Sequence, residues 1–142
     1  MNRDPKDLDS LMRLQGWAVD ERRRDLGALL ARQDALLEQD RALDQSLISE
    51  RDVARGEPRL AGHVFTVYVK DHFRRKEQMA ALLHGIAVEI EAARERLADA
   101  YREQKVLDEV REKWATARRI EEGRREQAFY DEVAQTRHVR RG

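Results

Sequence analysis

The sequence predicts an all-α protein, a long rod built as an antiparallel two-helix coiled coil, or αα-hairpin. Three observations point to this fold class. Apolar residues recur at alternating spacings of four and three, a single loop signal divides the chain, and 39% of the 142 residues are charged. So much charge leaves enough apolar residues to line a stripe on a helix but too few to fill a globular core. We therefore expect one coiled-coil domain over residues 1–142.

The first helix is predicted over residues 5–55. Asp4 and Pro5 suit its start, because an aspartate N-cap accepts a backbone N–H and a proline at the first helical position misses no hydrogen bond. Gly56 and Pro58 are stop signals at its end. Its side chains follow the 3.5-residue period of a coiled-coil seam. The seam positions hold Leu8, Met12, Gln15, Val19, Arg22, Leu26, Leu29, Gln33, Leu36, Asp40, Leu43 and Leu47.

Residues 56–62 form the only predicted loop, and the second helix is predicted over residues 63–138. A loop this short between long helices makes them antiparallel neighbours. The segment 63–69 is rich in β-branched and aromatic residues, which favour a strand, but the chain offers no second strand, so we expect a helix there. The seam of the second helix holds Met79, Leu83, Ile86, Ile90, Ala93, Leu97, Ala100, Gln104, Leu107, Arg111 and Trp114.

A second apolar stripe begins after residue 105 in the second helix and comprises Val106, Val110, Ala117 and Ile120. Either the seam drifts there or a second face for a partner appears. The turns beyond about residue 115 either pair with the start of the first helix or project past it. The polar seam residues either fix the register of the helices or weaken the packing so that the rod flexes or receives a partner.

Composition and motifs argue against several classes of function. Lys plus Arg and Asp plus Glu both total 28, and a net charge of zero supplies no overall field to attract nucleic acid. The chain has no cysteine and no stretch that reads as a signal peptide or a membrane span. Its four histidines are scattered, and no catalytic, phosphate-binding or metal-binding motif is present. We expect a cytoplasmic protein that is not an enzyme and binds no cofactor and no metal.

Several surface features admit two interpretations. Trp17, Tyr101 and Trp114 are either seam anchors, which the pattern favours, or exposed contact residues. The aromatic cluster of Phe65, Tyr68 and Phe73 is either local core or a patch that binds a partner, because exposed apolar surface often marks an interaction site. The arginine doublets near the end of the chain either form a solvated face or dock against acidic loops of a partner.

Three stretches of the chain resemble the FliJ proteins of the bacterial flagellar type III export apparatus, especially the alphaproteobacterial members. Residues 11–17 (LMRLQGW), followed by 20–23 (DERR), are similar to the N-terminal helix of the family. Residues 101–105 (YREQK) resemble its mid-helix motif, and residues 124–127 (RREQ) with Asp131 and Glu132 resemble its C-terminal motif. Together they span nearly the whole chain.

The resemblance implies a stalk similar to the gamma subunit of rotary ATP synthases. Its two termini would insert into a hexameric export ATPase ring, and its mid-chain end would face the membrane-embedded export gate. The coiled coil would also contact export chaperones. The chain would be a monomeric hairpin, in the cytoplasm and peripheral to the inner membrane at the flagellar base. By position, the residues expected to bind the gate are Phe65, Tyr68, Phe73, Met79 and Leu83. The residues expected to contact the ring are Leu8, Leu11, Arg13, Arg124, Arg125 and Arg137.

Three other functions stay open at this point. The closest alternative is the near-identical stalk of a virulence type III secretion system. A generic coiled-coil scaffold would have the same pattern but would dimerise through the seam. A nucleic-acid binder would use the arginine doublets, although glutamates alternate with them.

Overall fold

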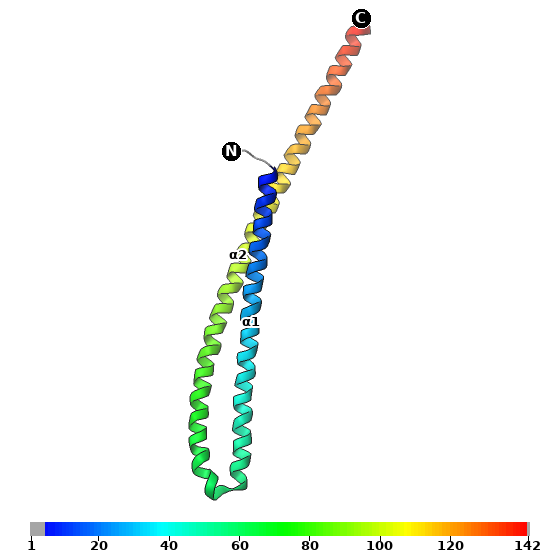
Figure 1. Ribbon diagram of the computed structural model, residues 1–142. Coiled ribbons are helices and arrows are strands. Elements are labelled where there is room, and N and C mark those ends of the chain that lie inside the picture. The colour runs from blue at the N-terminus through cyan, green and yellow to red at the C-terminus, as the bar shows by residue number, and fades with distance from the viewer. Residues whose placement is uncertain (1–4, 142) are drawn as a thin grey trace. The chain divides into compact units, whose positions relative to one another are not determined.

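The computed structural model describes residues 5–141 and contains two helices, α1 (Pro5–Gly56) and α2 (Pro58–Arg141) (Figure 1). Residues 5–141 contain no strand, and Glu57 alone separates the helices. The two helices run antiparallel where they lie side by side. The predicted all-α, antiparallel helical hairpin is therefore confirmed.

The ends of α1 follow the sequence signals. Pro5 is its first residue, where a missing N–H costs nothing, and Asp7 lies in the first turn, where a carboxylate is favoured by the helix dipole. Arg55 lies in the last turn, where a cation is favoured, and the helix ends at Gly56. The predicted N-cap, Asp4, lies outside the described residues.

The predicted loop over residues 56–62 is wrong in its extent. The structure reduces it to Glu57, because α2 begins at Pro58 rather than at residue 63. Proline is well tolerated in the first turn of a helix, where its fixed φ suits the helical conformation. Pro58 therefore starts the second helix instead of prolonging the loop. The segment 63–69 is helical, as predicted from the lack of a second strand.

The chain divides into two compact units, and each unit contains a part of α1 and a part of α2. Unit 2 comprises Val19–Asp99. Unit 1 comprises Met1–Ala18 and Ala100–Gly142, of which residues 5–18 and 100–141 are described. Each unit is considered separately below.

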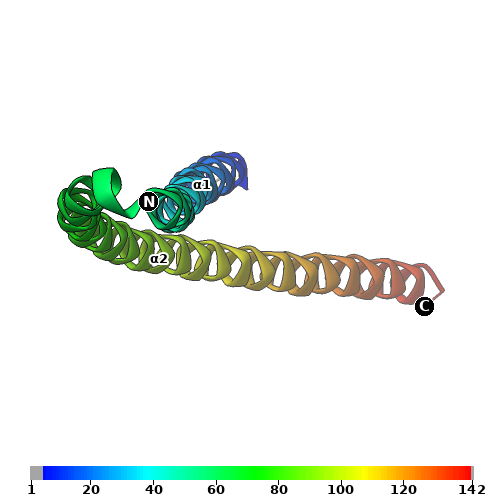
Figure 2. The ribbon, with the colours of Figure 1, turned by 90° about the horizontal axis from the view of Figure 1, so that it is seen from below.

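Unit 2 has the predicted seam, meaning the side chains with which α1 and α2 face each other. In α2 the buried members are Met79, Ile86, Ile90 and Ala93. In α1 the half-buried members are Leu26, Leu29, Gln33, Leu36, Asp40, Leu43 and Leu47. Figure 2, seen from the side of the turn, shows the two helices of this unit as separate coils joined by a short connection. Arg22 is an exception, since it is exposed and pairs within its own helix with Asp25 at 3.8 Å.

Unit 1 continues the seam for a few turns only. Leu8 and Ala100 are buried, and Met12, Gln15, Gln104, Leu107 and Trp114 are half-buried. The Gln15 Nε2 donates a hydrogen bond of 2.8 Å to the Ala100 carbonyl, so this polar seam residue links the helices. Arg111 is exposed and the half-buried Val110 replaces it, so the seam drifts by one residue here.

The tail, defined as residues 115–141 of α2, extends beyond the first turn of α1 (Figure 1). Every tail residue is exposed except the half-buried Val133. Of the two expectations for these turns, projection past α1 is therefore correct. Trp17 is 60% exposed, so the favoured prediction that it anchors the seam is wrong. The reason is its place on the helix, because Gln15 and Val19 hold the seam positions on either side of it.

Candidate functional sites

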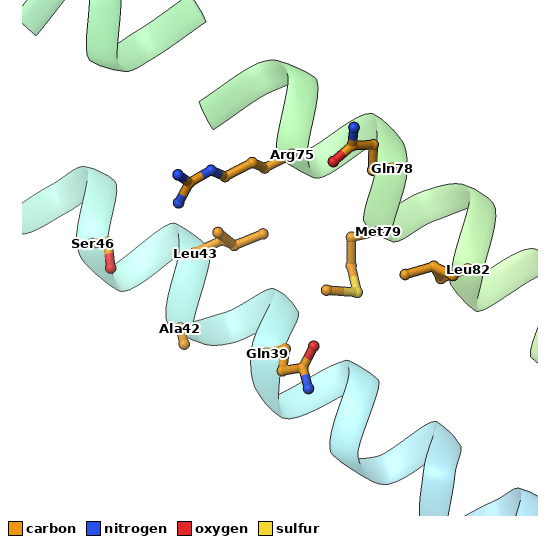
Figure 3. Close-up of a pocket in the computed structure, with 8 residues that line it drawn as sticks. All are labelled: Gln39, Ala42, Leu43, Ser46, Arg75, Gln78, Met79 and Leu82. Carbon is orange, nitrogen blue, oxygen red and sulfur yellow. The ribbon is translucent and has the colours of Figure 1, made fainter. Parts of the chain in front are cut away.

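A groove of about 390 Å³ lies between the helices of unit 2 (Figure 3). In Figure 3 the side chains of Leu43 and Met79 project into the space between α1 and α2, and Leu82 lies beside Met79. The groove is lined by Gln39, Ala42, Leu43 and Ser46 of α1 and by Arg75, Gln78, Met79 and Leu82 of α2. Its floor is apolar, and its rim carries amide, hydroxyl and guanidinium groups.

The groove opens because small and polar side chains flank the seam on one side. Ala42 supplies only a methyl group, and Gln39 and Ser46 are polar residues that do not close over Leu43 and Met79. As a result Leu82 remains about half exposed. Such a site is suited to one or two apolar side chains of a partner helix, with hydrogen bonds from the rim.

A polar layer lies within the seam of unit 2, beside the groove. The Lys76 Nζ is 2.6 Å from Asp40 Oδ1 and 3.1 Å from Asp44 Oδ2. The buried His72 places its Nε2 3.7 Å from Asp44 Oδ1. The hydrogen bond from Lys76 to Asp40 raises the pKa of the lysine above its ordinary value, against the opposing effect of partial burial, and the bond to Asp44 adds to the rise.

This polar layer fixes the register of the two helices. Lys76 reaches carboxylates one turn apart on α1, and a shift of α1 by one turn would leave one of these pairs unmade. Asp40 was predicted from its spacing as a polar seam position, whereas Lys76 and His72 were not. Lys76 lies three residues before Met79, and His72 lies four residues before Lys76. Extending the seam repeat of α2 towards its start therefore predicts both positions.

The residues expected to bind an export gate do not form one exposed patch. Met79 is buried, and Phe65, Tyr68 and Leu83 are half-buried. Only Phe73 is exposed, and its ring and the His72 ring form a T-shaped pair at a centroid distance of 5.9 Å. The structure brings Met79 into the groove, where Leu43 and Leu82 join it; neither was among the expected site residues. The hypothesis of an exposed aromatic cluster thus holds for Phe73 alone.

The residues expected to contact an ATPase ring all belong to unit 1. Leu11, Arg13, Arg124, Arg125 and Arg137 are exposed, and they are available to a partner. Leu8 is buried in the seam, so its expected role at a surface is wrong. Arg125 also pairs with Glu121 at 3.5 Å, an exposed pair one turn apart that constrains it only weakly.

The tail carries an aromatic pair that the sequence analysis missed. Phe129 and Tyr130 are both exposed and meet edge to face at a centroid distance of 5.9 Å. Val133 and Arg137 lie one and two turns further along the same side of the helix. These residues do not follow the seam spacing, so the coiled-coil pattern does not predict them. Two adjacent aromatic residues in a highly charged helix were the signal that could have found them.

The described residues give no sign of a metal or membrane site. Among residues 5–141, no group of three or more His, Asp or Glu side chains could hold a metal ion. Over the same range, neither α1 nor α2 has a stretch long and apolar enough to cross a bilayer.

Comparisons with known proteins add no relative. No protein-family model, no curated protein and no solved structure matches this chain.

Proposed function

We propose that this chain is a non-enzymatic stalk of the FliJ kind, which links a hexameric export ATPase to the export gate of a bacterial flagellar type III apparatus. In this proposal it acts as a single hairpin in the cytoplasm, peripheral to the inner membrane at the flagellar base. It contributes no chemistry of its own and makes exchangeable contacts with the ring, the gate and export chaperones.

The main support for this proposal is the exposed tail. A helix that extends some 27 residues beyond its partner, at about 1.5 Å per residue, presents roughly 40 Å of uncovered helix to another protein. Most helical stability in proteins comes from packing against other elements, and the tail has no such packing from α1, so a partner that covers it would stabilise it. Exposed Arg124, Arg125 and Arg137, together with Phe129 and Tyr130, give the tail both charged and aromatic contacts.

The second support is the groove of unit 2. A partner that inserts an apolar side chain between Leu43 and Leu82 would replace water against an apolar floor. In the proposed function this is the contact with the export gate, at the end of the hairpin opposite in sequence to the termini. It replaces Phe65 and Tyr68, which are partly covered, as the expected contact residues.

The test of the ring contact is a pull-down of the flagellar export ATPase with the full-length chain. Changing Arg124 and Arg125 to glutamate is expected to abolish binding, because two favourable charges become repulsive against an acidic partner surface. The matched control is Arg94→Glu with Arg96→Glu, which makes the same charge change on exposed positions of unit 2 and is expected to leave binding intact.

Two results would contradict the proposal. If the wild type fails to bind the ATPase at low salt while circular dichroism shows it helical, a generic scaffold is the better account. If it binds only the ATPase of a virulence system, the chain belongs to that apparatus. A strong, salt-dependent affinity for DNA or RNA would instead favour the nucleic-acid binder.

A further inference from the structure

Unit 1 has an open apolar face beside its seam. Leu11 (52%), Leu14 (56%), Val106 (57%) and Ile120 (55%) each leave about half of their surface exposed. Leu11, Leu14 and Val106 each directly precede a covered seam residue, namely Met12, Gln15 and Leu107. In an antiparallel pair of right-handed helices, the positions that precede the seam lie on the same side of both helices. These side chains therefore form one surface, here called the side face.

The side face continues along α2 past the point where α1 begins. Val106, Val110, Lys113, Ala117 and Ile120 follow one another at alternating spacings of four and three. This is again the coiled-coil period, displaced by one residue from the seam. Up to Val110 the stripe borders α1, and from Ala117 onward it belongs to the tail, which no other described residue covers. Beyond Val110 the stripe therefore keeps the coiled-coil period but has no partner helix among the described residues.

The apolar residues of this stripe are spaced almost symmetrically about a midpoint between Lys113 and Trp114. Val110 lies three residues before Lys113, and Ala117 lies three after Trp114. Val106 lies seven before Lys113, and Ile120 lies six after Trp114. Two copies of α2 that run antiparallel about this midpoint would therefore place apolar residues opposite apolar residues.

Charged residues at both ends of the stripe complete the same pattern. Glu103 lies ten residues before Lys113, and Arg124 lies ten residues after Trp114. In the antiparallel arrangement each Glu103 would face Arg124 of the other copy, which makes two equivalent ion pairs. Both side chains are exposed, and neither makes an ion pair with another of the described residues.

We propose that the side face binds a second copy of this chain, in a two-fold antiparallel pair in which each tail lies along the side face of the other copy's unit 1. Leu11 and Leu14 of one copy then cover Ile120 and the stem of Arg124 of the other. Each hairpin keeps its own seam, which distinguishes this pair from a scaffold dimerised through the seam.

The expected area is that of a weak, reversible association. Its apolar part consists of Leu11, Leu14, Val106 and Ile120, each with about half of its surface exposed, which corresponds to the low end of the size range of specific interfaces, about 1,200 Å² in total. At the midpoint, Lys113 of one copy lies opposite Lys113 of the other. Each ammonium group reaches solvent, but the two like charges repel each other. Replacing Lys113 with leucine is expected to tighten the pair about tenfold.

The proposal goes beyond the proposed function and does not depend on it. It has a consequence for that function, however, because the pair covers Leu11 and Arg124, two of the residues expected at the ring. The paired chain would then be the form that is not engaged with the ATPase.

The test is sedimentation velocity of the full chain over a range of concentrations. We expect the wild type to shift reversibly from monomer to dimer mass. Val106→Glu and Ile120→Glu are each expected to weaken the dimer by at least about tenfold, since each places two charges in an apolar contact. Val88→Glu is the matched control, because Val88 is as exposed as Val106 (57%) but lies in unit 2; it is expected to have no effect.

A charge exchange tests the antiparallel register itself. Glu103→Arg alone and Arg124→Glu alone are each expected to weaken the dimer, because like charges then face each other. The two substitutions together restore the ion pair with reversed sign and are expected to restore the dimer. Since the double variant still lacks Arg124, its ATPase pull-down reports separately on the proposed function.

Three outcomes would overturn the proposal. A wild type that stays monomeric up to the highest soluble concentration has no such pair. A dimer that Val88→Glu disrupts as strongly as Val106→Glu uses another surface. A double variant that dimerises no better than either single variant has a different register.

Discussion

Two isoleucines of the same helix show how differently the two units use their apolar residues. Ile90 in unit 2 is 4% exposed and packs in the seam against α1, whereas Ile120 in unit 1 is exposed on a part of α2 that α1 does not reach. Both lie on stripes with the coiled-coil period. The difference is that the chain supplies a partner helix for the first stripe and none for the second. A periodic apolar stripe therefore contributes to stability in unit 2 and remains available for binding in unit 1.

The largest expected effect is on the stability of unit 2. Ile90→Ala removes buried methyl and methylene groups and leaves a void in the seam, which costs about 2–4 kcal/mol. Ile120→Ala removes the same groups from a solvent-exposed position and changes the stability of the dilute chain by less than about 0.5 kcal/mol. Urea denaturation followed by circular dichroism measures both. Equal losses from the two variants would show that the tail is packed within the single chain.

Two glycines of α2 allow the same comparison between unit 2 and the tail, with smaller expected effects. At both Gly85 and Gly123, an added Cβ meets nothing within 4 Å, so alanine fits at either position. Alanine is favoured over glycine inside a helix by about 0.5–1 kcal/mol. Gly85→Ala is therefore expected to raise the denaturation midpoint of unit 2. Gly123→Ala is expected to increase the helix content of the tail at 25 °C and leave that midpoint unchanged.

Circular dichroism measures the helix content of both glycine variants, and urea titration measures their denaturation midpoints. A shift of the midpoint by Gly123→Ala equal to that of Gly85→Ala would contradict the account, because it would mean that the tail unfolds together with the paired helices.

The smallest expected effect concerns the polar layer and depends on pH. The folded-state pKa of Lys76 is raised, chiefly by its hydrogen bond to Asp40. Its contribution to stability is therefore fully present below about pH 10.4, the ordinary pKa of lysine, and is lost as the pH rises through the higher folded-state value. The difference in thermal midpoint between wild type and Lys76→Met is expected to be constant from neutral pH to about 10 and then to shrink.

The matched control for this experiment is Lys70→Met. Lys70 is an exposed lysine of the same helix and makes no ion pair with another described residue. A midpoint difference for Lys76→Met that does not change up to alkaline pH, or that Lys70→Met reproduces, would show that the Lys76 pairs do not stabilise the hairpin.

The sequence predicted the helices well because their seam is periodic. Leu43, Met79, Ile86 and Ile90 lie at the seam positions that the spacing of four and three predicts. The same spacing predicts Asp40 as a polar seam residue, although it does not identify Lys76 as its partner. The length of the loop was predicted poorly. The pattern from Gly56 to Gly62 suggests a break, but Pro58 fits a first helical turn as well as a loop, and local signals do not decide between the two.

The candidate sites were predicted less well, because they depend on what one helix places opposite the other. The groove of unit 2 arises where Ala42 and Gln39 of α1 leave Leu82 of α2 uncovered, a pairing that no single stretch of sequence reveals. Trp17 was misplaced for a related reason. A large aromatic residue favours burial on average, yet its position on the helix relative to Gln15 and Val19 determines that it is exposed.

The central claim is that the tail has no partner helix within the chain, whereas the two helices of unit 2 pair with each other through the seam. Hydrogen exchange measured by mass spectrometry, on the dilute chain alone and with the hexameric export ATPase, tests it most directly. The account predicts fast exchange over residues 115–141 of the free chain, slow exchange around Ile86 and Ile90, and protection of the tail when the ATPase is added. Slow exchange of the tail in the free chain, or protection confined to unit 2 in the complex, would contradict it.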